Sequence, residues 1–335
     1  MQPTESGHQG SLYQRSSPSQ SSVLAGFAAL CLIWGSTYLG IRVAIETLPP
    51  FVMAGVRWLL AGVVMYAWAR LRGAPRPTLA EWKTASVIGL LLFLGGQGST
   101  VWAESRIPSG LTAVLCATMP IWVLVLGWLR PGGRAPSVRL SVGSLVGLGG
   151  VVLLAAPWQT GAGSLDPVGV FVASLAPLSV AAGSMYLHEA RLPHSPLVGI
   201  GSQMICGGVL LCLMAVATGE WGHVSSGQMS LQSGLAFLYL TVFGSLIGYS
   251  LYAWLLRVRP PSFVSTYGYI NPAVALLLGW ALAEESLNLR TFLASTIILG
   301  AVVLVTAGRG DVGPELSQSR LLGTGTMSAT QGDVP

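Results

Sequence analysis

The stretch PSFVSTYGYINPAVALLLGWALAEE, at Pro261–Glu285, has the length and composition of a membrane-spanning helix with a proline near its middle. The stretch SGLTAVLCATMPIWVLVLGWL, at Ser109–Leu129, shows the same features when the numbering is shifted by 152 positions, which places Pro120 on Pro272. The chain is therefore predicted to hold two copies of one unit, each with a proline-interrupted span. Interrupted spans in matching positions of two repeats point to the substrate site of a transporter.

Apolar residues dominate the composition. Of the 335 residues, 52% are hydrophobic and 9% are charged, and the mean hydropathy is +0.66. Soluble domains carry about 25% charged residues, so the composition indicates a polytopic membrane protein. The net charge of +5 comes from basic residues in short loops between apolar runs, a pattern of membrane orientation rather than of nucleic-acid binding. The four cysteines lie inside apolar runs and no Walker A motif is present, so no disulfide framework and no cofactor or metal is expected.

Ten apolar runs have the length of about 20 residues that a helix needs to cross the bilayer. Five lie in residues 23–157 and five in 166–307, the two predicted repeats. The polar segments 1–22 and 308–335 are predicted to be disordered cytoplasmic tails. The predicted spans are Val23–Ile45, Phe51–Leu71, Trp82–Ala103, Ser109–Leu129, Leu140–Pro157, Asp166–Leu187, Pro196–Ala217, Gly234–Leu256, Pro261–Ala283 and Leu289–Ala307.

The orientation follows from the basic residues, most of which lie on the same side as the N-terminus. The positive-inside rule then predicts that both termini are cytoplasmic in a multi-pass protein of the plasma (inner) membrane. Because five is an odd number, the second repeat begins from the opposite face of the bilayer. The predicted fold is an all-α polytopic membrane protein, with ten transmembrane helices arranged as two inverted five-helix repeats, which suits alternating access.

Prolines and amides inside the spans are the first candidate site features. Pro120 and Pro272 each free the carbonyl four residues earlier, and Pro177 lies inside the sixth span. A freed carbonyl at this depth needs protein, water or ligand, so these prolines either face a hydrated cavity or mark simple packing kinks. Asn271 at mid-depth, and Gln97 among glycines near the end of the third span, are predicted to line that cavity.

Arg57 is the most conspicuous charged residue within the predicted spans, and it lies about two turns into the second one. A charge at this depth is costly and normally paired. Glu104, at the end of the third span, is the expected partner, with Glu46 as the other option. The pair is interpreted either as a fold-holding ion pair or as a binding site for substrate or protons.

Aromatic side chains at mid-depth suit a pocket for an amphipathic organic solute, and for each of them packing against lipid is the alternative. The full predicted substrate-binding set is Trp34, Ser36, Arg57, Gln97, Trp102, Glu104, Met119, Trp122, Tyr249, Tyr252, Tyr267 and Asn271, and the predicted helix breaks are Pro120, Pro177 and Pro272.

Several segments, among them IWGSTYLGIR, LPPFVMAGVRWLLAG, VWAESRIPSG and STYGYINPAVALLLGW, resemble the EamA-type drug/metabolite transporter superfamily and its YedA-like inner-membrane branch. The resemblance covers about Val23–Ala307 and implies two EamA units that move small metabolites or drugs, often outward. The family often has an acidic residue after both the fourth and the ninth span; here Glu285 fills the second place, but Arg130–Gly133 stands at the first. Residues of the family motifs map onto Arg57, Trp102, Glu104, Asn271 and Pro272.

The predicted function is secondary transport: export of small organic metabolites, either amino-acid-like or amphipathic and drug-like, by alternating access. Two alternatives stay open, an importer of a small metabolite and a non-transporting membrane receptor or scaffold. An enzyme is not expected, because all four histidines lie in loops or tails and no buried Ser–His pair can form. The expected partners are a small-molecule substrate and the lipid bilayer, with protons and a second copy of the chain left open.

Overall fold

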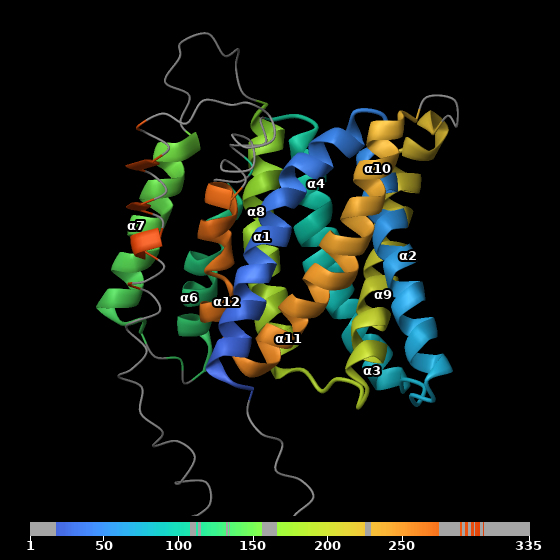
Figure 1. Cartoon of the computed structure of the whole chain (residues 1–335), viewed down its shortest axis with the longest axis horizontal. Helices are drawn as coiled ribbons and strands as arrows, with labels where there is room; N and C mark the ends of the chain where they lie inside the picture. Colours follow the sequence, from blue (N-terminus) through green and yellow to red (C-terminus); the bar gives the residue numbers. More distant parts are fainter. Residues whose placement is uncertain are drawn as a thin grey trace, which may run out of the picture.

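The computed structural model describes residues 18–107, 112, 115–131, 133, 135–155, 166–224 and 229–274, together with 289, 292–293, 296–297, 299–301 and 304. Within these residues the chain is a bundle of helices with no strand, and the long helices run roughly side by side (Figure 1).

Among the described residues, six helical segments are long and apolar enough to cross a membrane. They correspond to the predicted first, second, third, sixth, seventh and eighth spans. Two of the six are composite, each interrupted by a π-helix. The six are α1 (Gln20–Ile45), α2 (Pro50–Leu71), α3–η1–α4 (Leu79–Ile88, Gly89–Gly98, Ser99–Glu104), α8 (Pro167–Glu189), α9 (Pro196–Ala217) and α10–η3–α11 (Leu231–Tyr239, Leu240–Tyr249, Ser250–Val258).

The other predicted spans are described only in part. The fourth contains α6 (Met119–Leu129) and the fifth contains α7 (Val138–Ala155). The ninth begins with α12 (Pro261–Val264) and continues as helical backbone over 267–274, while the rest of the ninth and most of the tenth lie outside the described residues. The described part of the chain thus shows six full spans, and the number ten stays a prediction.

The first helix starts earlier than predicted. Ser19 caps α1 by accepting a hydrogen bond from the Ser22 amide at 3.2 Å, so the helix already begins at Gln20. The predicted tail 1–22 therefore includes the first turn of α1. A serine that can cap is a better start signal here than the first strongly apolar residue, Val23.

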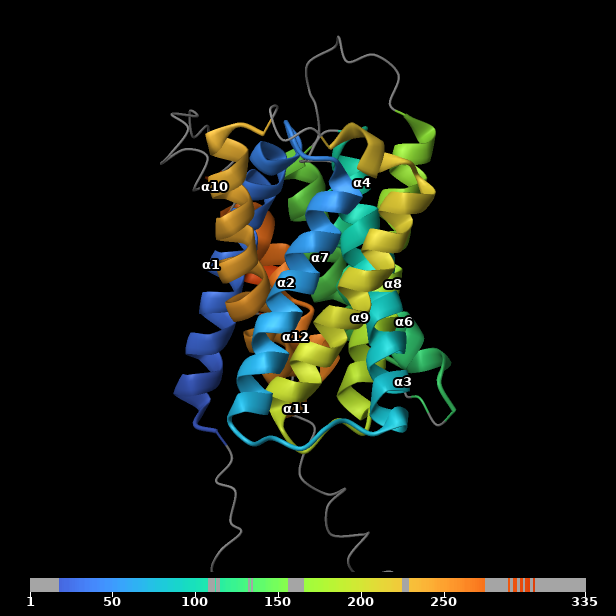
Figure 2. The ribbon, with the colours of Figure 1, turned by 90° about the vertical axis from the view of Figure 1, so that its right-hand side faces the viewer.

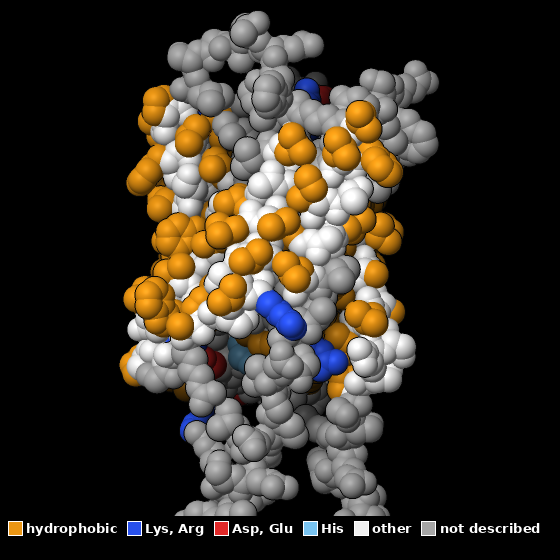
Figure 3. Space-filling view, turned by 90° about the vertical axis from the view of Figure 1, so that its left-hand side faces the viewer, with side chains coloured by type: hydrophobic (Ala, Val, Ile, Leu, Met, Phe, Trp, Pro, Cys, Tyr) orange, Lys and Arg blue, Asp and Glu red, His pale blue; other side chains and the backbone are white. Residues whose placement is uncertain are grey.

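Large apolar side chains cover the outside of the bundle. Leu145 and Phe171 are each 63% exposed, and hydrophobic side chains spread over the face shown in Figure 3 between its two ends. Exposed apolar surface of this extent marks contact with a membrane or a partner. Since the helices beneath have the length of membrane spans, the lipid bilayer is the natural solvent for this surface.

The helices α2 and α9 form the closest backbone packing in the bundle, and they run side by side in Figure 2. A Cβ atom at Gly62 would lie 2.7 Å from the Ile205 nitrogen, and one at Gly208 would lie 2.4 Å from the Leu59 nitrogen. The two contacts are equivalent under a shift of 146 positions, which takes Gly62 to Gly208 and Leu59 to Ile205. The two helices are therefore antiparallel and symmetric across glycines that no other residue could replace without separating them.

The first helix of each half packs against the interrupted span of the other half. Helix α1 contacts α10 and η3, whereas α8 contacts η1 and α4. At each contact, a side chain of the first helix donates a hydrogen bond to a backbone oxygen of the π-helix in the other half. Trp34 Nε1 donates to the Gly244 oxygen of η3 at 3.1 Å, and Ser179 donates to the Leu91 oxygen of η1 at 2.9 Å. The two halves are thus interlocked around the two π segments.

Acidic residues mark one end of the bundle, which we call the acidic end and define by Glu46, Glu104, Asp166 and Glu220. There Glu220 accepts hydrogen bonds from the Phe51 and Val52 amides at 2.7 and 3.1 Å, and so caps α2 from 169 residues away in the chain. Burial raises the pKa of Glu220 although both amides favour its charged form.

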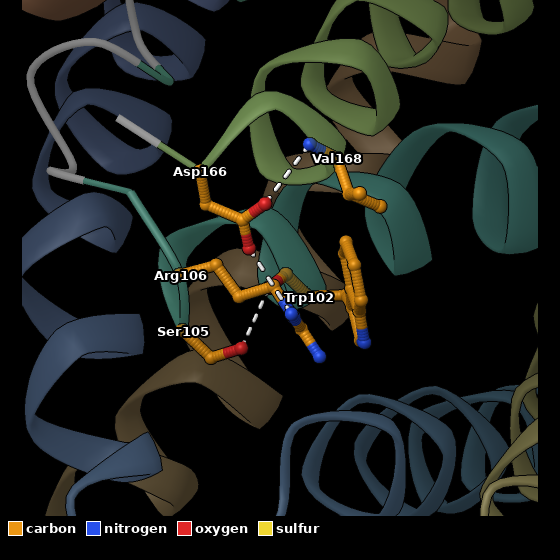
Figure 4. A network of polar contacts seen from close by, with 5 residues as sticks. All are labelled: Trp102, Ser105, Arg106, Asp166 and Val168. Carbon is orange, nitrogen blue, oxygen red and sulfur yellow. Dashed lines mark hydrogen bonds and ion pairs between the residues drawn. The ribbon is translucent and has the colours of Figure 1, made fainter. Parts of the chain in front are cut away.

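A second polar contact at the acidic end joins the two halves of the chain. Arg106, just after α4, pairs with Asp166 at 3.0 Å, and Asp166 also caps α8 through the Val168 amide at 2.9 Å (Figure 4). The guanidinium of Arg106 stacks 4.3 Å from the Trp102 ring. The hydrogen bond from Arg106 lowers the pKa of Asp166 below its usual range.

Candidate functional site

A cavity lies between the two halves of the described bundle, with about 70 Å³ of space for water-sized molecules. Helices α1, α2, α8 and α6, both π-containing spans and the helical backbone over 267–274 contribute to its wall. The lining residues belong to the first, second, third, fourth, sixth, eighth and ninth of the predicted spans. Of the predicted site residues, the lining includes Trp34, Arg57, Gln97, Met119, Pro177, Tyr267 and Asn271.

Arg57 is buried at the cavity wall, with 2% of its surface exposed. It lies seven residues after the start of α2, which is a depth of about 10 Å. Its Nη2 donates to Gln97 Oε1 at 3.4 Å, and its Nε has no hydrogen-bond partner. The strongest donor in the cavity is therefore only weakly engaged.

Glu104 does not pair with Arg57. The two groups are near enough to interact electrostatically, but no oxygen of Glu104 lies within 4 Å of an Arg57 nitrogen, and both Glu104 oxygens are buried without a partner. The reason is depth: Glu104 is the last residue of α4, whereas Gln97, seven residues earlier on the same face, lies at the level that Arg57 reaches. The predicted ion pair is wrong for this conformation.

Asn271 is 2% exposed, and its side-chain oxygen has no hydrogen-bond partner. It lies in the helical backbone over 267–274, which follows a turn at Ser265 and Thr266. Pro272 sits inside that helical stretch, so the helix is interrupted about a turn and a half before the proline and not at it. Asn271 thus presents an unsatisfied acceptor at the cavity wall.

Pro120 is the second residue of α6, which begins at Met119 after a turn at Ala117 and Thr118. Proline suits the first turn of a helix because its missing amide would have no partner there. Pro177 lies inside α8 and lines the cavity, whereas neither Pro120 nor Pro272 does. Backbone turns at 117–118 and 265–266 precede Pro120 and Pro272, whereas α8 runs through Pro177 without a break, so the predicted helix break at Pro177 is wrong.

Aromatic rings form the apolar part of the cavity wall. The rings of Trp34 and Tyr267 lie 5.0 Å apart, edge to face, and Trp34 is fixed by its bond to Gly244. Tyr38 and Trp58 complete the aromatic lining. A group with a flat apolar face would contact rings that are already held in place.

The remaining predicted binding residues lie elsewhere in the described bundle. Four of them have a clear alternative partner. Ser36 contacts the Tyr239 hydroxyl, Tyr249 donates to Gln203 at 2.6 Å, Tyr252 contacts Ser184, and Trp102 stacks on Arg106, while Trp122 packs beside Met119 and Val123.

Sequence reasoning missed Tyr38, Trp58, Thr37 and Thr100 as lining residues. Three of them had a signal: Thr37 and Tyr38 follow Trp34 by three and four residues, and Thr100 follows Gln97 by three, so each shares a face with a predicted residue. Trp58 had none, because adjacent residues on a helix normally point apart.

The sequence pattern of the EamA-like transporter family matches residues 21–156 and again residues 167–307. The chain belongs to the EamA-like transporter family. The uncharacterized inner membrane transporter YedA of Escherichia coli (strain K12) is 38% identical over 284 residues, which are 84% of this chain and 89% of YedA. This EamA protein therefore falls in the YedA-like branch that its sequence motifs indicated.

More distant relatives of this EamA chain include the Protein PecM of Dickeya dadantii (strain 3937), 25% identical over 83% of this chain and 90% of PecM. The WAT1-related protein At3g02690, chloroplastic, of Arabidopsis thaliana is 26% identical over 83% of this chain and 68% of that protein. One solved crystal structure matches with a TM-score of 0.68 at 19% identity, over 86% of this chain and 98% of the other. At that identity the match speaks for a shared fold alone.

Proposed function

We propose that this EamA protein is a secondary transporter of the inner membrane that exports small organic metabolites, amino-acid-like or amphipathic, by alternating access. The observation that carries the proposal is the cavity between the two halves, where the Nε atom of buried Arg57 and the side-chain oxygen of buried Asn271 have no hydrogen-bond partner among the described residues. Polar groups left unsatisfied inside a membrane protein mark a substrate pathway. The names of YedA as an inner membrane transporter and of the matching family support it.

The size of the cavity supports a cycle with distinct states. Drug-sized solutes occupy pockets of about 300–1,000 Å³. The cavity here, with about 70 Å³, has room for a few water molecules. We infer that the structure represents a closed state, and that the two halves separate to admit the solute from one side and release it on the other.

Profiling of the culture medium tests the export of a metabolite. Cells that express the intact protein are compared with cells that express an Asn271→Ala/Gln97→Ala variant, after checking that both proteins reach the membrane in equal amounts. A solute that accumulates outside only with the intact protein supports export. A solute that is depleted from the medium by the intact protein alone would instead identify an importer.

A reversible cross-link tests the alternating movement. A Cβ atom at Gly244 would lie 3.1 Å from Thr37 Cγ2, so cysteines at both positions can reach disulfide distance across the cavity wall. In Thr37→Cys/Gly244→Cys protein, oxidation should stop the flux found by profiling, and reduction should restore it. Flux that persists in fully cross-linked protein would show that α1 and η3 need not separate. The two single variants are the controls.

A further inference from the structure

Arg57 carries the one charged side chain among the residues that line the cavity in the described structure. It is 2% exposed, its Nε has no partner, and its bond to Gln97 is long at 3.4 Å. The ion pairs Arg106–Asp166 and Arg130–Glu189 both lie outside the cavity. The guanidinium therefore faces the cavity without a direct counter-charge.

A buried cation without a counter-charge is energetically unfavourable, and the ligand of the site is the natural source of one. A planar carboxylate matches the guanidinium fork and accepts two parallel hydrogen bonds from it. The Nε atom that has no partner and one Nη atom form one edge of that fork.

We propose that the substrate of this cavity is an organic anion that presents a carboxylate to Arg57 and a flat apolar body to the surrounding rings. The proposal rests on the proposed transport function and names the substrate class for the same site. Trp34 and Tyr267 offer ring faces and edges at fixed positions, and the free oxygen of Asn271 accepts a hydroxyl or amino group of the solute.

Other charge classes fit the cavity less well. Aromatic cages bind organic cations, but Arg57 in the same wall repels a cation. A phosphate monoester carries close to two negative charges, and sites for it commonly gather several basic side chains. The described lining supplies one. A carboxylate monoanion matches a single guanidinium in both charge and shape.

Three probes with the same ring and different charge test this inference: benzoate, benzamide and benzylammonium. Binding is measured by titration calorimetry and thermal stabilisation of the full chain in lipid nanodiscs, with sodium chloride at equal ionic strength as the reference. Benzoate should bind and stabilise the protein, benzamide should bind at least about tenfold more weakly, and benzylammonium should give no stabilisation.

Variants of Arg57 locate the effect. Arg57→Gln should weaken benzoate binding by about tenfold or more and should change benzamide binding little. Arg106→Gln, which alters an arginine outside the cavity, should leave the binding of all three probes unchanged and serves as the matched control. If Arg57→Gln fails to fold, the probe series on the unaltered protein still decides, because it compares charge alone.

The inference is overturned if benzoate fails to bind, if benzamide binds as well as benzoate, if benzylammonium is preferred, or if Arg57→Gln binds benzoate normally. These outcomes are separate from those of the transport test. A cation or neutral solute exported by the intact protein would reject the anion and leave the transport function in place. Benzoate binding without any flux would do the reverse.

Discussion

Arg57 donates a hydrogen bond to the neutral side-chain amide of Gln97, and not to a carboxylate, at its depth in the bundle. Glu104, the acidic residue that the sequence suggested as the partner of Arg57, comes seven residues after Gln97 on the same helical face. It therefore lies about 10 Å closer than Gln97 to the acidic end. Arg57 thus keeps its charge available, while Glu104, whose oxygens are buried without a partner in the described structure, opposes an anion only when it is ionised. The net attraction of the cavity for an anion depends on both groups.

Replacement of Glu104 by glutamine should therefore strengthen the binding of benzoate. At a pH where Glu104 is ionised, its removal takes away a repulsion of about 1 kcal/mol between its carboxylate and that of benzoate, which is about fivefold in Kd. The measurement is the titration described for the probe series, with Glu46→Gln as a control at the same end of the bundle. An unchanged Kd would show that Glu104 contributes no negative charge to the cavity.

For single residues, the sequence predicted which polar side chains line the cavity better than it predicted which residues contact one another. Arg57, Gln97 and Asn271 stood out because polar groups are rare within apolar runs, and all three line the cavity. Ser36, Tyr249 and Tyr252 are equally conspicuous in the sequence, but each forms a hydrogen bond or close hydroxyl contact with a residue far away in the chain. No local sequence pattern predicts a contact between residues that are 203 positions apart, as Ser36 and Tyr239 are, or 68 positions apart, as Ser184 and Tyr252 are.

Among the elements, α2 depends on a cap from outside its own repeat. Pro49 precedes the helix and offers no side-chain acceptor, so Glu220 takes that role for the Phe51 and Val52 amides. A carboxylate at a helix N-terminus also opposes the positive end of the helix dipole. The contact fastens the loop after α9 to the start of α2.

Glu220→Ala should lower the free energy of unfolding by about 1–2 kcal/mol, because two amides lose their acceptor. Glu220→Gln keeps an oxygen acceptor and should be milder, since burial already raises the pKa of Glu220 and disfavours its charge. Thermal unfolding in nanodiscs compares the two variants. Equal losses would mean that charge, rather than hydrogen bonding, holds the cap.

The Arg106–Asp166 contact predicts a pH dependence at the start of α8. Because the folded pKa of Asp166 is lowered, its stabilisation is fully present above the usual aspartate pKa of about 3.9 and is lost as the pH falls through the lower folded value. Arg106→Gln should reduce the melting temperature slightly at neutral pH, and the difference from the unaltered protein should vanish in acid. A difference that grows in acid would contradict this assignment.

For the whole molecule, the symmetric packing of α2 on α9 joins the two halves most closely. Composition and spacing were enough to predict an all-helical membrane protein with two related halves. The spans of the second half that fall after residue 274 lie largely outside the described residues. The π-helices η1 and η3 were not predicted, because both stretches are almost uniformly apolar and carry no residue pattern that distinguishes π-helical from α-helical hydrogen bonding.

Gly208→Ala should destabilise the protein by about 1–3 kcal/mol, since the new Cβ would lie 2.4 Å from the backbone of Leu59 and would separate α2 from α9. Gly149→Ala in α7 is the matched control, because no atom lies within 4 Å of its Cβ position, and alanine is the better helix former. Thermal unfolding measures both. A neutral Gly208→Ala would mean that the two helices move apart without loss.

The two π-helices allow parts of their spans to rotate about the helix axis. Successive residues of an α-helix are rotated by about 100° around the axis. If one wide turn of η1 relaxed to α-helical bonding, every later residue of that span would rotate by about one such step, and Gln97 and Thr100 would swing away from the cavity. The same twist in η3 would swing Gly244. The chain could then change which side chains a solute meets by rewinding two helices on their own axes.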